Sequence, residues 1–93
     1  MQKHRAWYRT QDGAKDYAFS FEQQSNGIWR AYIDSQPSYQ GRATDAHSTH
    51  RLSDGNRKYV CWTTALNSLA EAKQVASLWA DTTQRYIRTG RFS

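Results

Sequence analysis

The side chains that suggest chemistry most directly are His47 and His50, with Asp45 and Asp54 close to them in the sequence. A His-x-x-His pair with carboxylates is a known arrangement for binding a transition metal, and a histidine can serve as a general acid or base. On a strand, however, a spacing of three turns the two imidazoles to opposite faces, so a metal would require a loop or helical turn here. No second motif supports a metal site or a nuclease, and we expect these polar side chains to pin a connection between elements.

Two other features that often mark an enzyme also point elsewhere. Cys61, the single cysteine, lies within a strand-like segment, where a cysteine usually serves as a small buried hydrophobe. The five glycines are scattered as turn residues and form no phosphate-binding loop. The sequence therefore predicts a non-enzymatic protein with no catalytic residues, no resident metal, no cofactor and no small-molecule substrate.

The charge of the chain points to anionic partners. The 93 residues include 13 Lys and Arg against 8 Asp and Glu, for a formal net charge of +5, and most of the excess lies in residues 1–16 and 57–93. A positive field of this kind favours nucleic acid or an acidic protein surface and speeds the encounter with either. The same charge also keeps a small protein soluble, so both interpretations stay open.

Cations lie beside aromatic rings in residues 27–33 and 57–63, which alternate large apolar side chains with cationic or hydroxylic ones. Such rings stack on exposed bases and the cations neutralise phosphates, although the same side chains also shield an ordinary solvated sheet face. Near the end of a predicted helix, three arginines recur at a spacing of three, where they either contact a partner or stabilise the helix dipole. The candidate binding residues are Arg30, Tyr32, Lys58, Tyr59, Arg85, Arg88 and Arg91.

Strands and turns must position these side chains. Period-two alternation predicts strands over residues 5–10, 16–22, 28–34, 48–52 and 57–64. The Asp-Gly and Asn-Gly pairs between them are typical of hairpin turns. Consecutive strands joined in this way pair antiparallel.

A C-terminal helix is the clearest single element. Ser68 and Glu71 form a capping box that begins it, and Gly90 lies where it should end. Between them, apolar and small side chains recur at spacings of three and four, as one stripe of a helix: Leu69, Ala72, Val75, Ala76, Trp79, Thr83 and Tyr86. We expect this stripe to pack on one face of the sheet.

The predicted fold class is α+β, an antiparallel meander of three to five strands with one C-terminal helix packed on one face. The opposite choice of faces, with Ile28 and Tyr32 pointing inward, is the alternative. Residues 35–57 form a long connection, which in so small a domain is either functional or unstructured. The strand side chains expected to meet the helix stripe are Phe19, Phe21, Trp29, Ile33, Val60 and Trp62.

The chain is expected to fold as one domain over residues 1–93, with flexible ends at 1–4 and 91–93. No apolar stretch follows the start and no run is long enough to span a membrane, so neither a secretory signal nor a membrane partner is predicted. An unpaired cysteine fits a reducing interior, and we expect a cytoplasmic protein. The early basic residues form either a flexible arm that reaches along a groove or a disordered end: Lys3, His4, Arg5 and Arg9.

The order of strands, turns and helix resembles the small DNA-binding modules of plant ethylene-response factors and of the arm-binding domains of transposon integrases. The matching segments are Gly27–Ile33 as a middle strand, Lys58–Trp62 as a last strand and Ser68–Ala72 at the start of the helix, within an outline that covers residues 17–88. The resemblance implies that the sheet face opposite the helix enters the major groove of DNA. Those modules have short turns where this chain has residues 35–57.

Residues 37–42 and 49–55 resemble small uncharacterised proteins of bacterial phages and conjugative elements, which include regulators, recombination accessories and inhibitors of host defence enzymes. Two functions are therefore predicted. The first is a mobile-element module that binds DNA or RNA through the basic residues named above. The alternative is an anti-CRISPR-like inhibitor that binds an acidic surface of a host nuclease, with exposed anchors at Trp7, Tyr8, Tyr32 and Tyr39.

Overall fold

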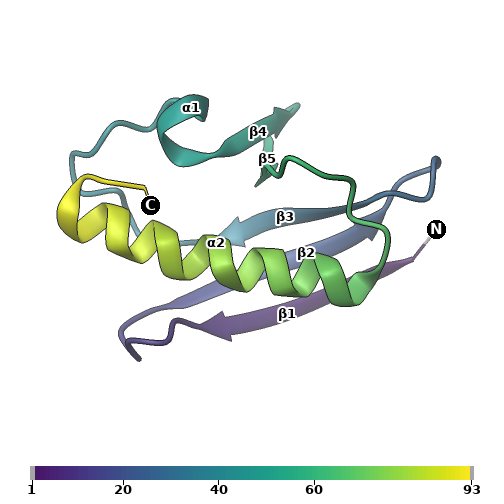
Figure 1. Cartoon of the computed structure of the whole chain (residues 1–93), viewed down its shortest axis with the longest axis horizontal. Coiled ribbons are helices and arrows are strands. Elements are labelled where there is room, and N and C mark those ends of the chain that lie inside the picture. Colours follow the sequence, from purple (N-terminus) through teal and green to yellow (C-terminus); the bar gives the residue numbers. More distant parts are fainter. Residues whose placement is uncertain (1, 93) are drawn as a thin grey trace.

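A computed structural model describes residues 2–92 and confirms the α+β fold (Figure 1). Five strands form one antiparallel sheet in the order β1-β2-β3-β5-β4, and one long helix crosses one face of it. In chain order the elements are β1 (Lys3–Arg9), β2 (Asp16–Gln23), β3 (Trp29–Ser35), α1 (Ala46–Thr49), β4 (Arg51–Asp54), β5 (Arg57–Val60) and α2 (Leu69–Thr89).

The hairpin turns form where the turn-forming pairs predicted them. Gly27, with φ of 86°, and Gly55, with φ of 63°, both adopt left-handed backbone that a residue with a Cβ rarely takes. β1 and β2 keep one register from the pair Lys3–Glu22 to the pair Arg9–Asp16. β3 and β5 share only the pair Tyr32–Tyr59, so these two strands separate toward the start of β3.

The core lies between the sheet and α2, and its centre is aromatic. The ring of Trp79 on α2 meets the rings of Tyr17 and Phe19 edge-on, with centroids 5.9 and 6.1 Å away. Trp29 and Ala31 also face this core, so the predicted choice of faces on β3 is confirmed and the alternative with Ile28 and Tyr32 inward is wrong. The remaining core side chains include Phe21, Val60, Leu66, Ala72, Val75, Ala76 and Ala80.

Both ends of α2 form as their residue types predict. The N–H of Glu71 donates to the Ser68 hydroxyl at 3.1 Å, and the N–H of Gly90 donates to the Tyr86 carbonyl at 2.7 Å. Gly90 has φ of 80°, the left-handed backbone that ends a helix. The apolar side of the helix packs on the sheet as far as Ala80, and Tyr86 beyond it packs on Tyr39 of the long connection.

The fifth predicted strand is shorter than expected. β5 ends at Val60, and the chain then leaves the sheet. The Trp29 N–H donates to the Leu66 carbonyl at 2.8 Å, in the place where a longer β5 would have paired with β3. Trp62 therefore lies outside the core with 42% of its surface exposed, contrary to the prediction. Cys61, expected inside a strand as a buried hydrophobe, follows β5 and is half-buried.

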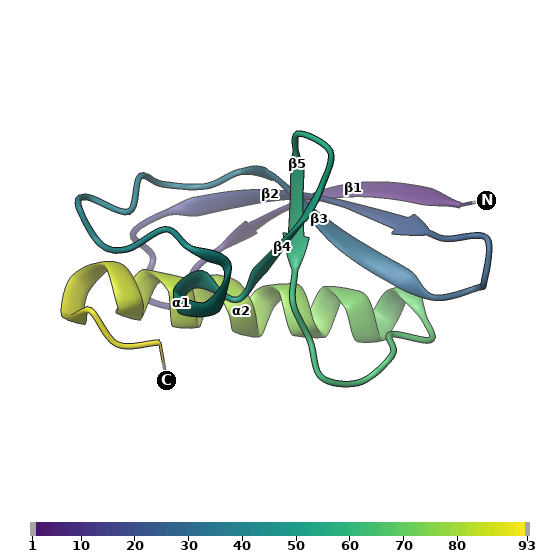
Figure 2. The same cartoon turned by 90° about the horizontal axis from the view of Figure 1, so that it is seen from above.

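The long connection is ordered, and the strand predicted over residues 48–52 forms three residues later, as β4. Asp45 caps the short helix α1, His50 ends it in left-handed backbone with φ of 54°, and β4 begins only at Arg51. The indole N–H of Trp79 donates to the Thr49 carbonyl at 3.0 Å and fastens α1 to α2 (Figure 2). Because of these bonds, this part of the connection is fixed against α2 and is not a free loop.

The basic residues near the start of the chain form no free arm. Lys3, His4, Arg5 and Arg9 all belong to β1, which corrects the expected basic arm. Residues 1 and 93 of the ends expected to be flexible lie outside the described residues. On the inner side of this strand, the Tyr8 hydroxyl donates to Asp81 on α2 at 2.7 Å. Burial and this carboxylate raise the pKa of Tyr8 to about 12.

Candidate functional site

The sheet face that points away from α2 gathers charge and aromatic rings, and we name it the open face. Strand alternation places on it the odd-numbered residues of β1, β5 side chains 57 and 59, and the even-numbered residues of β2, β3 and β4. Three of the predicted binding residues, Arg30, Tyr32 and Tyr59, therefore meet at its centre. Figure 2 shows α2 on one side of the sheet, opposite to this face.

The centre of the open face is held by one carboxylate. Asp54 accepts from the Tyr32 hydroxyl at 2.7 Å and from the Arg30 guanidinium at 3.1 Å. Arg30 also lies over the ring of Tyr59, 4.3 Å from its centroid. Burial, with the bond that its hydroxyl donates to Asp54, raises the pKa of Tyr32. The bond that Arg30 donates to the Tyr32 hydroxyl is the main cause of the raised pKa of Arg30.

A second arginine completes this cluster from β5. Arg57 donates to both oxygens of Glu22, at 2.8 and 3.2 Å, and its guanidinium lies 3.7 Å from the centroid of the Tyr32 ring. Tyr32 is consequently buried although it points away from the core, because Arg57 and Tyr59 pack on its ring. This burial removes Tyr32 as an exposed anchor.

Every carboxylate of the open face has an arginine partner. Asp54 pairs with Arg30 and Glu22 with Arg57, and the edge of the sheet adds two more pairs. These are Arg9–Asp16 at 2.9 Å and Arg5–Asp34 at 3.5 Å. The open face is thus a network of ion pairs across strands, in which the predicted phosphate-binding cations already have anionic partners.

The other predicted binding residues lie elsewhere. Lys58 points to the opposite side of β5 from Tyr59 and donates to the Ser53 hydroxyl at 2.6 Å. Arg85 and Arg88 are on α2, where Arg88 pairs with Asp12 of the β1–β2 turn at 2.8 Å. Arg91 follows the helix and is exposed. The seven residues therefore fall in three separate regions rather than in one patch.

The anchors predicted for a protein partner are mostly wrong. Tyr32 and Tyr39 are buried, and Tyr8 is half-buried against Asp81. Trp7 alone of the four is well exposed, at 69%. These rings were proposed as anchors for their residue type alone, and neighbours in space cover them, as the Arg51 guanidinium does the ring of Tyr39.

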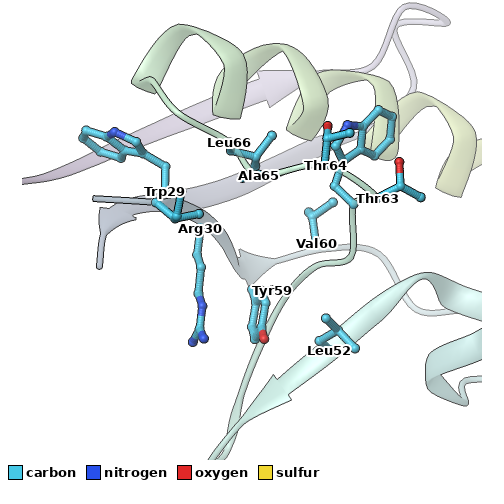
Figure 3. Close-up of a pocket in the computed structure, with 11 residues that line it drawn as sticks. Trp29, Arg30, Leu52, Tyr59, Val60, Thr63, Thr64, Ala65 and Leu66 are labelled. Atoms are coloured by element: carbon cyan, nitrogen blue, oxygen red, sulfur yellow. The ribbon is translucent and has the colours of Figure 1, made fainter. Parts of the chain in front are cut away.

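Sequence reasoning missed an apolar groove that centres on Trp62. Leu52, Trp62 and Leu78 expose 40, 42 and 50% of their surfaces. Leu52 lines one hollow and Leu78 lines another, and Trp62 lines both. The first hollow, of about 240 Å³, lies between the start of β3, the β4–β5 hairpin and residues 62–66 (Figure 3). The second, of about 260 Å³, lies between residues 62–66 and α2. We name them together the Trp62 groove.

The fold itself explains why this groove stays open. β5 and β3 separate beyond the pair Tyr32–Tyr59, and residues 62–66 cross the gap to reach Trp29. Figure 3 shows Val60, Leu66 and Ala65 beside this gap, with Arg30 and Tyr59 at its outer side. One signal was present in the sequence, because Leu78 is a large apolar residue that falls off the predicted stripe of α2.

The two histidines of the candidate cluster lie in different local structures. His47 lies within α1, while His50 follows that helix and stacks on the ring of Phe92 at 4.3 Å. Over residues 2–92, no three His, Cys, Asp or Glu side chains converge as metal ligands would. The arrangement is that of polar side chains at the end of the long connection.

One prediction tests the ion-pair network. The Arg57 guanidinium holds the pKa of Glu22 below its ordinary value, so this pair stabilises the fold above that value and loses its effect as the pH falls through the lowered pKa. We expect Glu22→Gln to reduce the free energy of unfolding by about 1 kcal/mol at pH 7, because partly exposed pairs contribute this much at most. The difference from the wild type should shrink toward pH 3.

Urea unfolding at pH 7 and pH 3 measures this difference. Arg57→Gln should give a loss similar to that of Glu22→Gln, and the double variant should lose less than the sum of the two. A difference between the wild type and Glu22→Gln that stays constant down to pH 3 would contradict the assigned pair.

Two further findings bear on function. Within residues 2–92 no helix combines the length and apolar character needed to cross a bilayer. Comparisons with known protein families, with curated proteins and with solved structures find no match to this chain.

Proposed function

We propose that this domain is a non-enzymatic protein-binding module whose main contact surface is the Trp62 groove. The observation that supports this most strongly is the joining of three large exposed apolar side chains, Leu52, Trp62 and Leu78, around two hollows. Apolar patches of this kind on a small soluble domain mark interaction sites, and tryptophan is prominent among residues that dominate binding energy.

The rim of the groove has the polar character of a protein interface. Arg30 and Thr63 line the first hollow, and Glu71 and Gln74 line the second. A core of aromatic and aliphatic side chains inside a polar rim is the usual anatomy of a specific protein contact. Both hollows are open along the surface, whereas a small-molecule site usually encloses most of its ligand.

The open face is less suited to nucleic acid than its residue types suggested. Arg30 and Arg57 are engaged by Asp54 and Glu22, so a phosphate would have to compete with a carboxylate for each guanidinium. The four carboxylates of this face would also repel a polyanion. A protein partner avoids this conflict because it presents mixed charge.

The partner that fits best is a protein that presents a protruding apolar side chain surrounded by acidic residues. The acidic residues would complement the net charge of +5 on this chain. An enzyme that acts on nucleic acid, such as a host defence nuclease, is one protein of this kind, and occupying its surface would inhibit it. The module would then act without chemistry of its own, as a small inhibitor encoded by a mobile element.

Nucleic-acid binding is the second candidate, and the C-terminal end of α2 favours it. Arg85, Arg88 and Arg91 lie on and just after the last turns, and Arg42 donates to the carbonyls of residues 87 and 88 at 3.2 and 3.0 Å. Four guanidinium groups thus share one end of the molecule. Phosphate contacts there would make binding fall steeply with added salt.

Affinity capture from the lysate of the source cell distinguishes the two candidates. The bait is the full chain, used with and without nuclease treatment and at two salt concentrations. The protein-binding proposal expects a discrete protein partner that stays bound after nuclease treatment. Loss of all bound material on nuclease treatment, together with release by Arg85→Gln/Arg88→Gln/Arg91→Gln, would overturn it in favour of nucleic-acid binding.

A further inference from the structure

The two edges of the sheet differ in length and regularity. β4, at one edge, has four residues, whereas β1, at the other, has seven residues that all pair with β2 in one register (Figure 1). β1 contains no proline and no bulge, two devices that usually block an edge. Its outer side therefore offers a straight row of backbone donors and acceptors.

Hydrogen bonds at both ends of β1 show which backbone groups face outward. The Gln23 N–H donates to the Gln2 carbonyl at 3.0 Å, and the Thr10 N–H donates to the Lys15 carbonyl at 2.9 Å. Antiparallel ladders alternate, so the even-numbered residues of β1 bond to β2 and the odd-numbered ones direct their backbone groups to the free edge. The side chains of these same odd residues lie on the open face: Lys3, Arg5, Trp7 and Arg9.

The exposure of Trp7 on this edge strand needs an explanation other than protection of the edge against aggregation. Charged residues on an edge strand normally prevent unwanted pairing, and Lys3, Arg5 and Arg9 fit that role. Trp7 is 69% exposed, because its cross-strand neighbour is Ala18, whose methyl group gives the indole little cover. A large ring in the middle of an unpaired edge is suited to contact with an incoming chain.

We infer that the free edge of β1 accepts an extended acidic segment of a partner protein as a sixth strand. Charge selects this occupant. A second copy of this chain would bring the cations of one β1 against those of the other, which opposes pairing. Arg5 is the best receptor, because its side chain is 76% exposed and its distance to Asp34 is 3.5 Å, the longest of the described ion pairs.

The register defines the segment. Alternate residues of an added antiparallel strand face Arg9, Trp7, Arg5 and Lys3 in turn, so the matching pattern is acidic, apolar, acidic, acidic at every second position. Backbone bonds supply affinity, and these side-chain pairs supply selection. This surface lies at the opposite sheet edge from β4, so the inference stands beside the Trp62 groove and does not depend on it.

A capped, fluorescein-labelled peptide tests the inference directly. The peptide has Glu at positions 1, 5 and 7, Val at position 3 and Thr between them, and its binding to the full chain is followed by anisotropy at low salt. The control peptide has the same sequence with N-methyl groups on the amides that would face β1. We expect the control to bind about tenfold more weakly, since it loses backbone hydrogen bonds and keeps the charge.

Matched variants separate the backbone contribution from charge. Arg5→Gln removes the cation and keeps the outward N–H, whereas Arg5→Pro removes both without breaking a bond to β2. The proline variant should bind the peptide about tenfold more weakly than the glutamine variant, and Lys73→Gln, a change of the same charge on α2, should bind as the wild type does. Thermal unfolding checks that each variant is folded.

Three results would overturn the inference. Equal affinity for the N-methylated peptide would reduce the interaction to simple charge attraction. No binding at low salt would remove the acidic-strand occupant altogether. Displacement of the peptide by a single-stranded oligonucleotide that protects the same edge amides from hydrogen exchange would assign the edge to nucleic acid. Each readout uses a synthetic probe, so it is independent of the capture that tests the Trp62 groove.

Discussion

Replacing Trp79 with alanine will reduce the free energy of unfolding by roughly 3–5 kcal/mol, the usual loss for a buried aromatic side chain. Trp79 is 2% exposed and is among the largest fully buried side chains of the described chain. Its removal leaves Tyr17 and Phe19 without the ring that they meet edge-on and opens a cavity between β2 and α2. A domain of this size has a total stability of about the same order, so much of the population should unfold.

A second substitution at this position separates packing from tethering. Trp79→Phe keeps an aromatic ring against Tyr17 and Phe19 but loses the N–H that bonds to the Thr49 carbonyl. We expect this variant to lose about 1–3 kcal/mol and to speed hydrogen exchange in α1 more than in β2. Urea unfolding and exchange measurements check both variants. A loss below about 1 kcal/mol for Trp79→Ala would contradict the central place given to this ring.

The parts of the fold that local pattern determines were predictable. The capping box at Ser68, the stripe through Trp79 and the stop at Gly90 define α2 within one segment, and each depends on residues three or four apart. The choice of faces on β3 followed from alternation, because Trp29 and Ala31 bury where a helix must cover the sheet. These features need no knowledge of distant parts of the chain.

The errors arose where contacts between distant segments decide the outcome. Trp62 continues the alternation of β5 in the sequence. In the structure the Trp29 N–H bonds to the Leu66 carbonyl instead of to a residue of β5, and Trp62 lies outside the sheet. The helical turn at 46–49 depends on a cap from Asp45 and on a bond from Trp79, 30 residues away. Neither event has a periodic signature, so alternation alone predicted a strand in both places.

The pairing of charges at the candidate site could not be predicted from the sequence. Counting charges along the chain gives no indication of which carboxylate meets which cation, and Arg57 and Glu22 pair across 35 positions. Arg30, Tyr32 and Tyr59 were rightly placed on one face, whereas Lys58 was not. The pairing of Arg30 with Asp54 depends on the sheet order β3-β5-β4, which the sequence pattern does not define. A basic sequence can therefore fold into a surface whose charges are internally balanced.

The largest expected effect on binding is at Trp62. Trp62→Ala should weaken capture of the protein partner by about 30-fold or more, equivalent to at least about 2 kcal/mol, because an exposed tryptophan at the meeting point of two hollows has the features of an interface hot spot. Leu78→Ala, on the helical side of the groove, should weaken capture by a smaller factor without harm to the helix, since alanine is at least as good a helix former. Titration of the immobilised partner with each variant measures both effects.

A loss of capture by Trp62→Ala is informative only if the variant is as stable as the wild type. Trp62 is 42% exposed, so its removal should leave the midpoint of urea unfolding close to that of the wild type, unlike the change at Trp79. Lys73→Ala is the matched control, because it truncates a long exposed side chain on the same helix outside the groove. If Trp62→Ala captured the partner as well as Lys73→Ala does, the partner would bind elsewhere, and the groove would be only a gap that the separation of β3 and β5 leaves in the sheet.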